Sequence, residues 1–340
     1  MTSFERIEQG GHELVVLGAD PKVGYRGIIA IHNTTLGPAA GGTRFWRYET
    51  EAEALEDVLR LSRGMTCKNA MAGLPLGGGK SVIWDQGGDR REVLKAHARR
   101  IQELGGRYVT AEDVGTTLAD LDIMREVTPH VLGSSSGLGD SAPYTARGVF
   151  RAIEAAAEHR WGDASLAGRT VVIQGTGGVG GNLARLLAAA GAYLILADTQ
   201  PARAENLAAE LGGRAIDPRA VYDTTADIFA PCALGGVLND DSIPKLNVEI
   251  IAGGANNQLL EPRHAGMIAD RGILYAPDYV ANAGGVISGA VELFGWDTSD
   301  LLPRIDAIHQ TMTHVLQYAD EHRITTAAAA DRLAEEKLHG

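Results

Sequence analysis

A lysine beside bare backbone is the first sign of chemistry in this sequence. Residues 73–81 read Gly-Leu-Pro-Leu-Gly-Gly-Gly-Lys-Ser, so three consecutive glycines precede Lys80. Because glycines carry no side chains, we expect a turn in which a substrate can press against peptide groups. A confined, poorly hydrated space disfavours a charged ammonium, and the like charge of Lys68 acts in the same direction. Both effects would let Lys80 act as a base near neutral pH.

Two other interpretations of this stretch are a phosphate-binding loop and a purely structural turn with an exposed lysine. The phosphate-binding motif G-x-x-x-x-G-K-[ST] requires glycine six positions before the lysine, where this chain has Leu74. That motif also leads from a strand into a helix, whereas residues 81–84 read as a strand that follows the glycines. The spacing therefore disfavours the phosphate loop, and the structural turn stays open.

A glycine fingerprint for dinucleotides follows a predicted strand at 170–174. Residues 175–180 read Gly-Thr-Gly-Gly-Val-Gly, match G-x-G-x-x-G and lead into a helical segment. Gly175 would allow the tight turn, Gly177 the approach of the pyrophosphate, and Gly180 close packing of the helix on the strand. The start of the helix would offer unpaired N–H groups to the phosphates. A glycine-rich turn without a ligand is the alternative.

An acidic residue at the end of the next predicted strand bears on the choice of dinucleotide. That strand covers 193–197 and is followed by Asp198. Its carboxylate can accept hydrogen bonds from both hydroxyls of an adenosine ribose and would repel a 2′-phosphate, which favours NAD over NADP. Arg203 follows closely in the sequence and could accommodate a phosphate, so NADP stays open.

A second carboxylate of interest is Asp113, which lies between a predicted strand at 107–110 and a predicted helix at 118–127. Carboxylates at such junctions often cap the helix. A carboxylate that shares a site with a lysine can instead carry protons. Taken alone, Asp113 fits both interpretations.

The spacing of apolar residues divides the chain into two halves joined by a Gly/Ser-rich linker at 133–140. Such a linker indicates a hinge beside a cleft whose closure would exclude water. The second half alternates strands and helices in the manner of a parallel sheet, and the tail at 301–338 reads as two helices broken near 324. The further expected elements are strands at 13–18, 27–32, 227–230, 248–252 and 273–276 and helices at 51–69, 90–104 and 180–190.

Composition excludes several classes of protein. The chain has 340 residues, which is enough for two domains with separate cores. A net charge of −12 argues against nucleic acid or an anionic membrane as the partner. We expect no membrane span, since the chain lacks an apolar run of eighteen residues, and no secretory signal. Two cysteines, Cys67 and Cys232, fit a reducing cytoplasm, and without paired histidines or a Cys/His cluster we expect no metal site.

Several ordered motifs accompany these residues along nearly the whole chain. Beside Lys68, Lys80, Asp113 and the fingerprint, they are Thr-Thr-Leu-Gly-Pro at 34–38, Gly-Gly-Thr-Arg at 41–44, Ala-Pro-Cys-Ala-Leu-Gly-Gly at 230–236, Ala-Asn-Asn-Gln-Leu at 255–259 and Tyr-Ala-Pro-Asp-Tyr-Val-Ala-Asn-Ala-Gly-Gly at 275–285. In this combination the chain resembles the Glu/Leu/Phe/Val dehydrogenase family, most closely its leucine, phenylalanine and tryptophan dehydrogenase branch.

The resemblance implies reversible oxidative deamination, in which an L-amino acid, NAD+ and water give a 2-oxo acid, ammonium and NADH. Lys68 matches the lysine that binds the substrate carboxylate, and Lys80 matches the lysine that activates water. Asp113 matches the acid that passes protons to and from the nitrogen. The chemistry agrees, because addition of water to the iminium and collapse of the carbinolamine each require a positioned proton carrier.

The resemblance also assigns binding residues. The backbone of Gly41 and Gly42 matches the segment along the substrate carboxylate, Asn257 a polar residue near the substrate, Asn256 one near the nicotinamide ribose, and Thr145 the threonine near the nicotinamide carboxamide. The full expected cofactor set is Thr145, Gly175, Thr176, Gly177, Gly178, Val179, Gly180, Asp198, Thr199, Ala230, Pro231, Cys232, Ala233 and Asn256. The expected side-chain pocket is Ala40, Ala111, Val286 and Gly289.

These pocket residues are small or medium in size and uncharged, so we expect a bulky apolar L-amino acid. Leucine-type and phenylalanine-type substrates both stay open, as does an enzyme specific for aromatic substrates. One methylene in an apolar pocket changes binding by only ~1–3 kcal/mol, so broad specificity is expected. A non-catalytic NAD-binding module and a 2-hydroxy-acid dehydrogenase are the alternatives from other classes.

The expected architecture is α/β with two domains and an active site in the cleft between them. Residues 1–134 form the substrate-binding and oligomerisation domain, on which a helix at about 325–340 packs, and residues 135–324 form a Rossmann-type NAD-binding domain. The family forms homo-oligomers, so we expect at least a dimer, with an apolar strand near 14–17 as a candidate edge.

Overall fold

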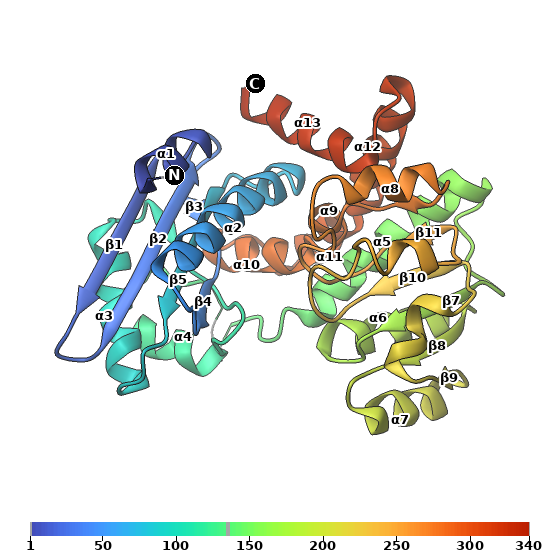
Figure 1. Cartoon of the computed structure of the whole chain (residues 1–340), viewed down its shortest axis with the longest axis horizontal. Helices are drawn as coiled ribbons and strands as arrows, with labels where there is room; N and C mark the ends of the chain where they lie inside the picture. The colour runs from blue at the N-terminus through green and yellow to red at the C-terminus, as the bar shows by residue number, and fades with distance from the viewer. Residues whose placement is uncertain (1, 134–136, 340) are drawn as a thin grey trace. The chain divides into compact units, whose positions relative to one another are not determined.

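The computed structural model describes residues 2–133 and 137–339, which form two compact units. Unit 1 comprises Met1–Gly139, Gly289–Trp296 and Ala334–Gly340, and unit 2 comprises Asp140–Ser288 and Asp297–Leu333. Each unit combines helices with a six-stranded sheet, so the expected two-domain α/β fold is confirmed (Figure 1). The expected boundary after residue 134 and part of the expected linker at 133–140 lie outside the described residues.

The sheet of unit 1 has the strand order β1-β2-β5-β3-β6, and β4 also pairs with β5. Pairing is antiparallel between β1 and β2 and between β2 and β5, whereas β3 and β4 run parallel to β5. The strands are β1 (Leu14–Asp20), β2 (Tyr25–Asn33), β3 (Ala39–Ala40), β4 (Thr43–Trp46), β5 (Gly77–Trp84) and β6 (Tyr108–Val109), and the helices include α1 (Ser3–Gln9), α2 (Glu51–Met71), α3 (Arg90–Glu103) and α4 (Leu118–Arg125). The apolar strand expected near 14–17 is β1, at one edge of this sheet.

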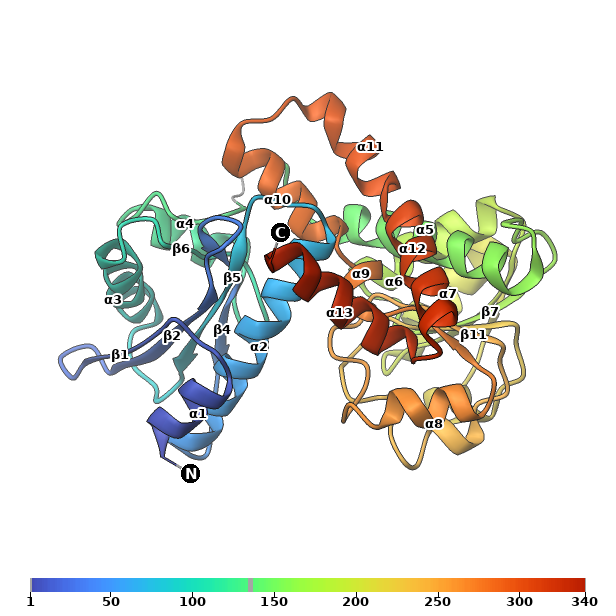
Figure 2. The same ribbon diagram turned by 90° about the horizontal axis from the view of Figure 1, so that it is seen from above.

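Side chains that alternate along the strands give this sheet two faces, each covered by a different helix. On one face, Ile28 and Val82 pack with Val58 of α2. On the other face, Ile29 packs with Ile101 of α3. Figure 2 shows α2 and α3 on opposite sides of the strands. Consecutive residues of β5 therefore point toward different helices.

Capping residues determine where these two helices begin. The Thr50 side chain accepts the N–H of Glu53 at the start of α2, and Asp89 accepts the N–H groups of Arg91 and Glu92 at the start of α3. Each cap pairs an N–H group that has no partner inside the helix. Both helices begin where the sequence predicts.

The glycines before Lys80 form part of strand β5, so the expected turn is wrong. Gly77, Gly78 and Gly79 pair with β2 and β3. Packing within the protein requires glycine at these positions. A Cβ at Gly78 would overlap the backbone of Thr66 in α2, and one at Gly79 would meet the ring of Tyr108. The glycines thus let α2 and β6 approach β5 closely.

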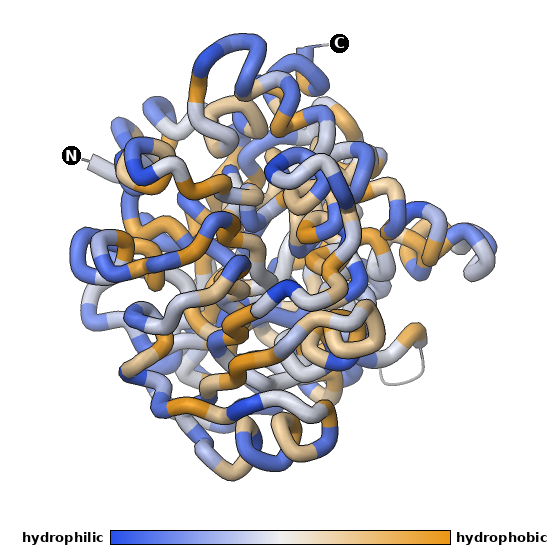
Figure 3. The backbone as a smooth tube through the Cα atoms, turned by 90° about the vertical axis from the view of Figure 1, so that its right-hand side faces the viewer, coloured by the Kyte–Doolittle hydropathy of each residue, from blue (hydrophilic) through white to orange (hydrophobic). Residues whose placement is uncertain are grey.

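Unit 2 contains a parallel sheet with the order β12-β11-β10-β7-β8-β9. The chain moves outward from β7 through β8 to β9 and then returns to the other side of β7 at β10, so a topological switch point lies between β7 and β10. Figure 3 shows hydrophobic and hydrophilic segments alternating along the backbone. The strands are β7 (Thr170–Gln174), β8 (Tyr193–Ala197), β9 (Arg214–Ala215), β10 (Ile228–Pro231), β11 (Ile250–Ile251) and β12 (Leu274–Tyr275).

Helices connect these strands and form the tail. They are α5 (Ala142–Trp161), α6 (Gly178–Ala189), α7 (Pro201–Leu211), α8 (His264–Asp270), α9 (Asp278–Ala281), α10 (Gly284–Phe294), α11 (Leu301–Asp306), α12 (Ile308–His322) and α13 (Thr326–His339), with short 3-10 helices at Pro218–Asp223, Ile243–Lys245 and Thr298–Asp300. The tail has three helices rather than the expected two, because a further break falls at Ala307. The expected break lies at Arg323, which ends α12 in a left-handed conformation. Near the end of α13, within unit 1, Lys337 Nζ donates to the Ala70 carbonyl of α2 at 3.2 Å.

The packing on β5 predicts opposite effects for two glycine-to-alanine substitutions. Gly78→Ala should destabilise the protein by about 1–3 kcal/mol, because the new methyl group overlaps helix backbone that cannot move aside. Gly64→Ala on the exposed side of α2 is the matched control; a Cβ there meets nothing within 4 Å, and the change should stabilise by about 0.5–1 kcal/mol. Thermal unfolding midpoints of both variants measure this. Equal midpoints would contradict the packing role of Gly78.

Candidate active site

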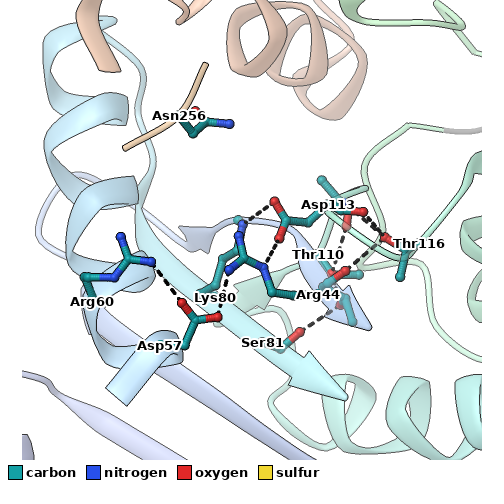
Figure 4. Close-up of polar contacts among 12 residues, drawn as sticks. Arg44, Asp57, Arg60, Lys80, Ser81, Thr110, Asp113, Thr116 and Asn256 are labelled. Carbon is teal, nitrogen blue, oxygen red and sulfur yellow. Dashed lines mark hydrogen bonds and ion pairs between the residues drawn. The ribbon is translucent and has the colours of Figure 1, made fainter. Parts of the chain in front are cut away.

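A buried ion pair joins two of the residues that the sequence singles out. Lys80 Nζ lies 3.0 Å from Asp113 Oδ1, and Lys80 is only 5% exposed. Arg44 Nε donates to the other carboxylate oxygen of Asp113 at 2.9 Å. Figure 4 shows the three side chains meeting at the Asp113 carboxylate. The ammonium thus lies in a confined site, as expected, and does not point into bulk solvent.

Arg44 extends this group to α2. Its NH1 donates to Asp57 Oδ2 at 2.8 Å, and the Tyr48 hydroxyl donates to the same oxygen at 2.7 Å. Arg60 pairs with Asp57 Oδ1 from the exposed side at 2.9 Å (Figure 4). We call Lys80, Asp113, Arg44 and Asp57 the ion-pair cluster. Two carboxylates balance two cations within it, which is the condition for burying such charges.

The charges in the cluster set the protonation of Asp113. Burial by itself would raise the pKa of the Asp113 carboxyl, but Lys80 and Arg44 outweigh it and hold that pKa below its usual value. Burial also opposes the charge of Arg44, yet Asp113 and Asp57 raise the pKa of its guanidinium. Asp113 is therefore ionised at neutral pH, in the state that can accept a proton.

Strand alternation and register explain why these side chains meet. Arg44 of β4 is paired with Val82 of β5, on the face that α2 covers, and Lys80 lies two residues before Val82 on the same face. Asp57 reaches the cluster from α2. The loop after β6 brings Asp113 alongside, where Phe45 N–H donates to the Val114 carbonyl at 3.0 Å.

The turn of α2 that carries Lys68 is fixed against the glycines of β5. Asn69 Nδ2 donates to the Gly77 carbonyl at 2.6 Å, and Thr66 packs on Gly78. Lys68 is 9% exposed on this turn. A Cβ at Gly41 would overlap the Gly79 carbonyl, so that glycine is required by packing as well.

Asp113 does not cap the following helix, so that interpretation is wrong. The N-cap of α4 is Thr117, which forms a capping box with Asp120. Thr116 Oγ1 instead fixes the Asp113 backbone, since it accepts the Asp113 N–H at 2.9 Å and lies 2.9 Å from the Thr43 carbonyl. The carboxylate of Asp113 is thereby left for Lys80 and Arg44.

The glycine fingerprint has the geometry of a dinucleotide loop. Gly175 adopts a φ of 92°, in the left-handed region that a tight turn requires. A Cβ at Gly180 would overlap the Gly175 carbonyl, so helix and strand are in close contact. Gly177, the N-cap of α6, differs: a Cβ there meets nothing within 4 Å of the protein, and its spacing leaves room for a ligand. The first turn of α6 lies at the carboxyl end of β7, beside the switch point.

Other expected cofactor residues lie at the same edge of the parallel sheet. Asp198 follows β8, where its carboxylate accepts the N–H of Thr176 at 2.7 Å and of Gln200 at 2.8 Å. Burial opposes ionisation of Asp198, and these hydrogen bonds outweigh it to lower the pKa of the carboxyl. Cys232 directly follows β10, and its N–H is donated to the Gln174 carbonyl at 2.8 Å.

The expected site residues divide between the units. Unit 2 brings together the fingerprint loop, Asp198 and the end of β10. Of the two expected asparagines in this unit, Asn256 accepts a hydrogen bond at Oδ1 from Asn282 Nδ2 at 2.9 Å. Asn257 adopts a φ of 53°, in the left-handed region. The expected residues in unit 1 are Lys68, Lys80, Asp113, Gly41, Gly42, Ala40, Ala111 and Gly289, and those in unit 2 are Thr145, Gly175, Thr176, Gly177, Gly178, Val179, Gly180, Asp198, Thr199, Ala230, Pro231, Cys232, Ala233, Asn256, Asn257 and Val286.

Sequence reasoning gave no role to Arg44 or Asp57, although both belong to the cluster. The signal for Asp57 is an acidic residue within the buried stripe of α2, one position before Val58. For Arg44 the signal is its alternation with Thr43 on a strand. Neither signal names a partner, because the partners are distant in sequence.

Three further observations concern metal ligands, membrane spans and cysteines among the described residues. No cluster of three or more His, Cys, Asp or Glu residues there could hold a metal ion, and none of the helices there has the length and apolarity to cross a membrane. Burial raises the pKa of the Cys232 thiol to about 12, so this thiol stays protonated. Cys67 forms no disulfide with Cys232.

Comparison with known proteins places the chain in a family. Residues 18–130 match the model of the Glu/Leu/Phe/Val dehydrogenase dimerisation domain, and residues 137–202 and 198–339 match that of glutamate/leucine/phenylalanine/valine dehydrogenase. Leucine dehydrogenase of Geobacillus stearothermophilus is 49% identical over 99% of this chain and 94% of that protein. Valine dehydrogenase of Streptomyces coelicolor is 47% identical over 97% and 93%.

Solved structures agree with this placement. L-tryptophan dehydrogenase from Nostoc punctiforme superposes with a TM-score of 0.88 at 42% identity, covering 99% of this chain and 98% of that one. Glutamate dehydrogenase from Thermus thermophilus, at 21% identity and a TM-score of 0.77, shares the fold. The chain therefore belongs to the Glu/Leu/Phe/Val dehydrogenase family. The expected family and the expected enzyme class, an amino-acid dehydrogenase, are confirmed.

We expect unequal costs for removing Arg44 from the cluster and for removing Arg60, which pairs with the cluster from outside. Arg44→Met should destabilise the protein by ~3–5 kcal/mol, because Asp57 and Asp113 each lose one of their two cations and the rest of the cluster keeps an excess negative charge. Arg60→Met, which removes an exposed partner of Asp57, is the control and should cost only ~0.2–1 kcal/mol. Denaturant unfolding measures both values.

The stability cost of Arg44→Met should depend on pH, because Arg44 pairs with the Asp113 carboxylate. The folded pKa of Asp113 is lowered, so its stabilisation is present above the unfolded value of 3.8 and is lost as the pH falls through the folded pKa. The deficit of Arg44→Met should thus be largest at neutral pH and should shrink below about pH 4. A deficit independent of pH would contradict the charge pairing.

Proposed function

We propose that this protein catalyses the reversible, NAD-dependent oxidative deamination of a bulky apolar L-amino acid to the 2-oxo acid and ammonium. The single observation that carries the proposal is the buried Lys80–Asp113 ion pair at 3.0 Å. It joins the two kinds of proton carrier that addition of water and release of ammonia require. Membership of the amino-acid dehydrogenase family supplies the reaction class.

The two residues have complementary proton roles. The ionised Asp113 accepts a proton from the substrate ammonium, which must become an amine before hydride leaves the α-carbon. Once Asp113 is protonated, Lys80 releases its own proton to solvent, which is the net proton of the overall reaction. Its amine then takes a proton from the water whose hydroxide adds to the iminium carbon. Asp113 then returns its proton to the nitrogen as ammonia departs. NAD supplies the hydride acceptor.

Lys68 binds the substrate carboxylate in this proposal. It lies on the same turn of α2 as Asn69, which is held against Gly77, so the ammonium of Lys68 is carried by a rigid element. Gly41 and Gly42 bring bare backbone to the neighbouring strand ends. Their packing against Gly79 and Glu112 explains why glycine is needed there and leaves the substrate contact as a proposal.

Small uncharged residues support an apolar substrate. Ala40 is buried on β3, Ala111 is half-buried, and a Cβ added at Gly289 would only reach van der Waals distance from Leu132. Relatives named leucine and valine dehydrogenase and a structure named tryptophan dehydrogenase act on apolar amino acids of different size. We propose leucine-type substrates first, with aromatic substrates as the second candidate.

NAD is the proposed dinucleotide, because Asp198 follows β8 at the position where a carboxylate accepts ribose hydroxyls. We also propose a homo-oligomer that forms through unit 1, with β1 as the edge strand. Leu17 of β1 is 55% exposed, and a long exposed edge strand of this kind is a template for pairing. The presence of only two cysteines in the sequence fits the reducing cytoplasm as the proposed location.

An amino-acid panel with a lysine variant tests the function. The protein should reduce NAD+ with leucine and phenylalanine at a higher kcat/KM than with glutamate. Lys80→Ala should lower kcat by ~10²–10⁴-fold because the proton carrier is lost, with NADH binding retained because the fingerprint loop of unit 2 is unchanged. Lys95→Ala, which removes a lysine on α3 paired with Glu126, is the control and should stay near wild type. A Lys80→Ala enzyme with full activity, or a preference for glutamate, would overturn the proposal.

The choice of dinucleotide is tested at Asp198. Asp198→Ala removes the acceptor of the ribose hydroxyls and the charge that repels a 2′-phosphate. Losing such charged hydrogen bonds costs about 1.5–3 kcal/mol, so the ratio of kcat/KM for NAD+ over NADP+ should fall at least about tenfold. Steady-state kinetics with both cofactors measure the ratio. An unchanged ratio would remove Asp198 from the cofactor site.

A further inference from the structure

A second polar group is buried on the opposite face of the strands that carry the ion-pair cluster. His97 of α3 is fully buried, and its Nε2 lies 2.9 Å from Ser81 Oγ. Its Nδ1 lies 2.9 Å from the hydroxyl of Tyr25. Ser81 Oγ continues to Thr43 Oγ1 at 2.7 Å, and Thr43 to Thr110 Oγ1 at 2.5 Å. We call these five residues the His97 network.

The members of this network are sequence neighbours of the cluster. Ser81 follows Lys80 in β5, and Thr43 precedes Arg44 in β4. Because side chains alternate between the two faces of a strand, Ser81 and Thr43 point to α3 while Lys80 and Arg44 point to the α2 side. The network therefore links β4 and β5 on the face that α3 covers, while the ion pair lies on the opposite face of the same strands.

The network also reaches the loop of Asp113. Thr110 lies three residues before Asp113 on the same connection. Thr116 Oγ1 accepts the Asp113 N–H and lies 2.9 Å from the backbone carbonyl of Thr43. Both ends of the Asp113 loop are thus tied to Thr43, so a shift of Thr43 would move Asp113 relative to Lys80.

Hydrogen-bond accounting assigns a direction to the network. The Tyr108 hydroxyl lies 2.6 Å from the Gly41 carbonyl, which can only accept, so Tyr108 donates there and has no second proton for Ser81 Oγ, 3.2 Å away. If Tyr25 donates to His97 Nδ1, then Nε2–H donates to Ser81, Ser81 to Thr43, and Thr43 to Thr110. Every hydroxyl proton in this arrangement has an acceptor, with Thr110 reaching the Ala111 carbonyl at 3.5 Å.

The opposite direction fails at Tyr25. If His97 Nδ1 carried the proton, it would donate to the Tyr25 oxygen, and the phenolic proton would need another acceptor. The hydroxyl of Tyr25 has no other hydrogen-bond partner among the described residues, and Tyr25 is only 1% exposed. A buried donor without an acceptor is costly, so the structure selects the Nε2–H form. Burial lowers the pKa of His97 to about 3, which keeps the ring neutral.

We propose that His97, as the neutral Nε2–H tautomer, is a positioning residue for the Lys80–Asp113 pair. It holds Ser81 through one donated hydrogen bond and, through Ser81, sets the position of Thr43. The inference rests on the proposed function, since it assumes that Lys80 and Asp113 carry protons. Beyond that function, it assigns the tautomer of His97 and a structural coupling between the two faces of the sheet.

Two substitutions separate positioning from packing. His97→Leu fills the space but removes the donor, and we expect kcat to fall ~10–10²-fold, because a displacement of about 1 Å near the chemistry costs that much. His97→Gln places an amide N–H where Nε2–H was and should keep kcat within about threefold of wild type. NADH should bind to both variants with unchanged affinity. A His97→Leu enzyme with wild-type kcat would overturn the proposal.

A stability control excludes a merely structural effect. Leu94 is fully buried on α3, one turn before His97, and has no role in the site. Leu94→Ala should lower the thermal midpoint at least as much as His97→Leu and leave kcat within about twofold, since it opens a cavity in the core shared with Ile83 but keeps the hydrogen bond from His97 to Ser81. Assays run well below both midpoints compare the variants. Equal losses of kcat in the two variants would overturn the proposal.

The tautomer itself has a readout that is independent of activity. Nitrogen NMR of the wild-type protein with labelled histidine should show His97 with a protonated Nε2 and an unprotonated Nδ1, unchanged between pH 6 and 9. A proton on Nδ1 would overturn the assignment. If Lys80→Ala proves active while the tautomer and the His97→Leu loss are as expected, the role of Lys80 fails and the coupling stands.

Discussion

An ammonium and a carboxylate buried 3.0 Å apart are the constraint that the rest of unit 1 satisfies. Neither Lys80 nor Asp113 could be buried alone, because the cost of removing one charge from water exceeds what packing returns. Arg44 would leave the pair with an excess positive charge, and Asp57 of α2 balances it. The cluster is therefore neutral overall, and its composition explains why four side chains from three elements and a loop must meet at one point.

The geometry that brings them together is the two-residue period of a β-strand. One face of β4 and β5 carries charge, and the other carries hydroxyl groups that the neutral His97 ring holds in place. Polar groups on both faces of a central strand are expensive unless all are paired. Here each face supplies its own partners, from α2 on one side and from α3 on the other, so the strand is rigid where the chemistry is proposed.

Glycines serve two different purposes in this fold. At Gly78 and Gly180 a side chain would overlap backbone of the protein itself, so glycine is required for helix and strand to approach. At Gly177 the protein leaves open space, so the fold alone gives no reason for a missing side chain there. The distinction shows that the glycines before Lys80 serve packing first.

The sequence by itself determined the class of fold, the fingerprint and its strand, the family, and the pairing of a lysine with Asp113 as candidate chemistry. Those follow from local patterns: period-two strands, the spacing of glycines, and ordered motifs. Only the tertiary structure showed that the glycine turn is a strand, that Asp113 is not a helix cap, and that Arg44 and Asp57 complete the charge balance. Within the cluster, Arg44 lies 13 positions from Asp57 and 69 positions from Asp113 along the chain. The register between strands, which no local pattern specifies, decides which of them meet.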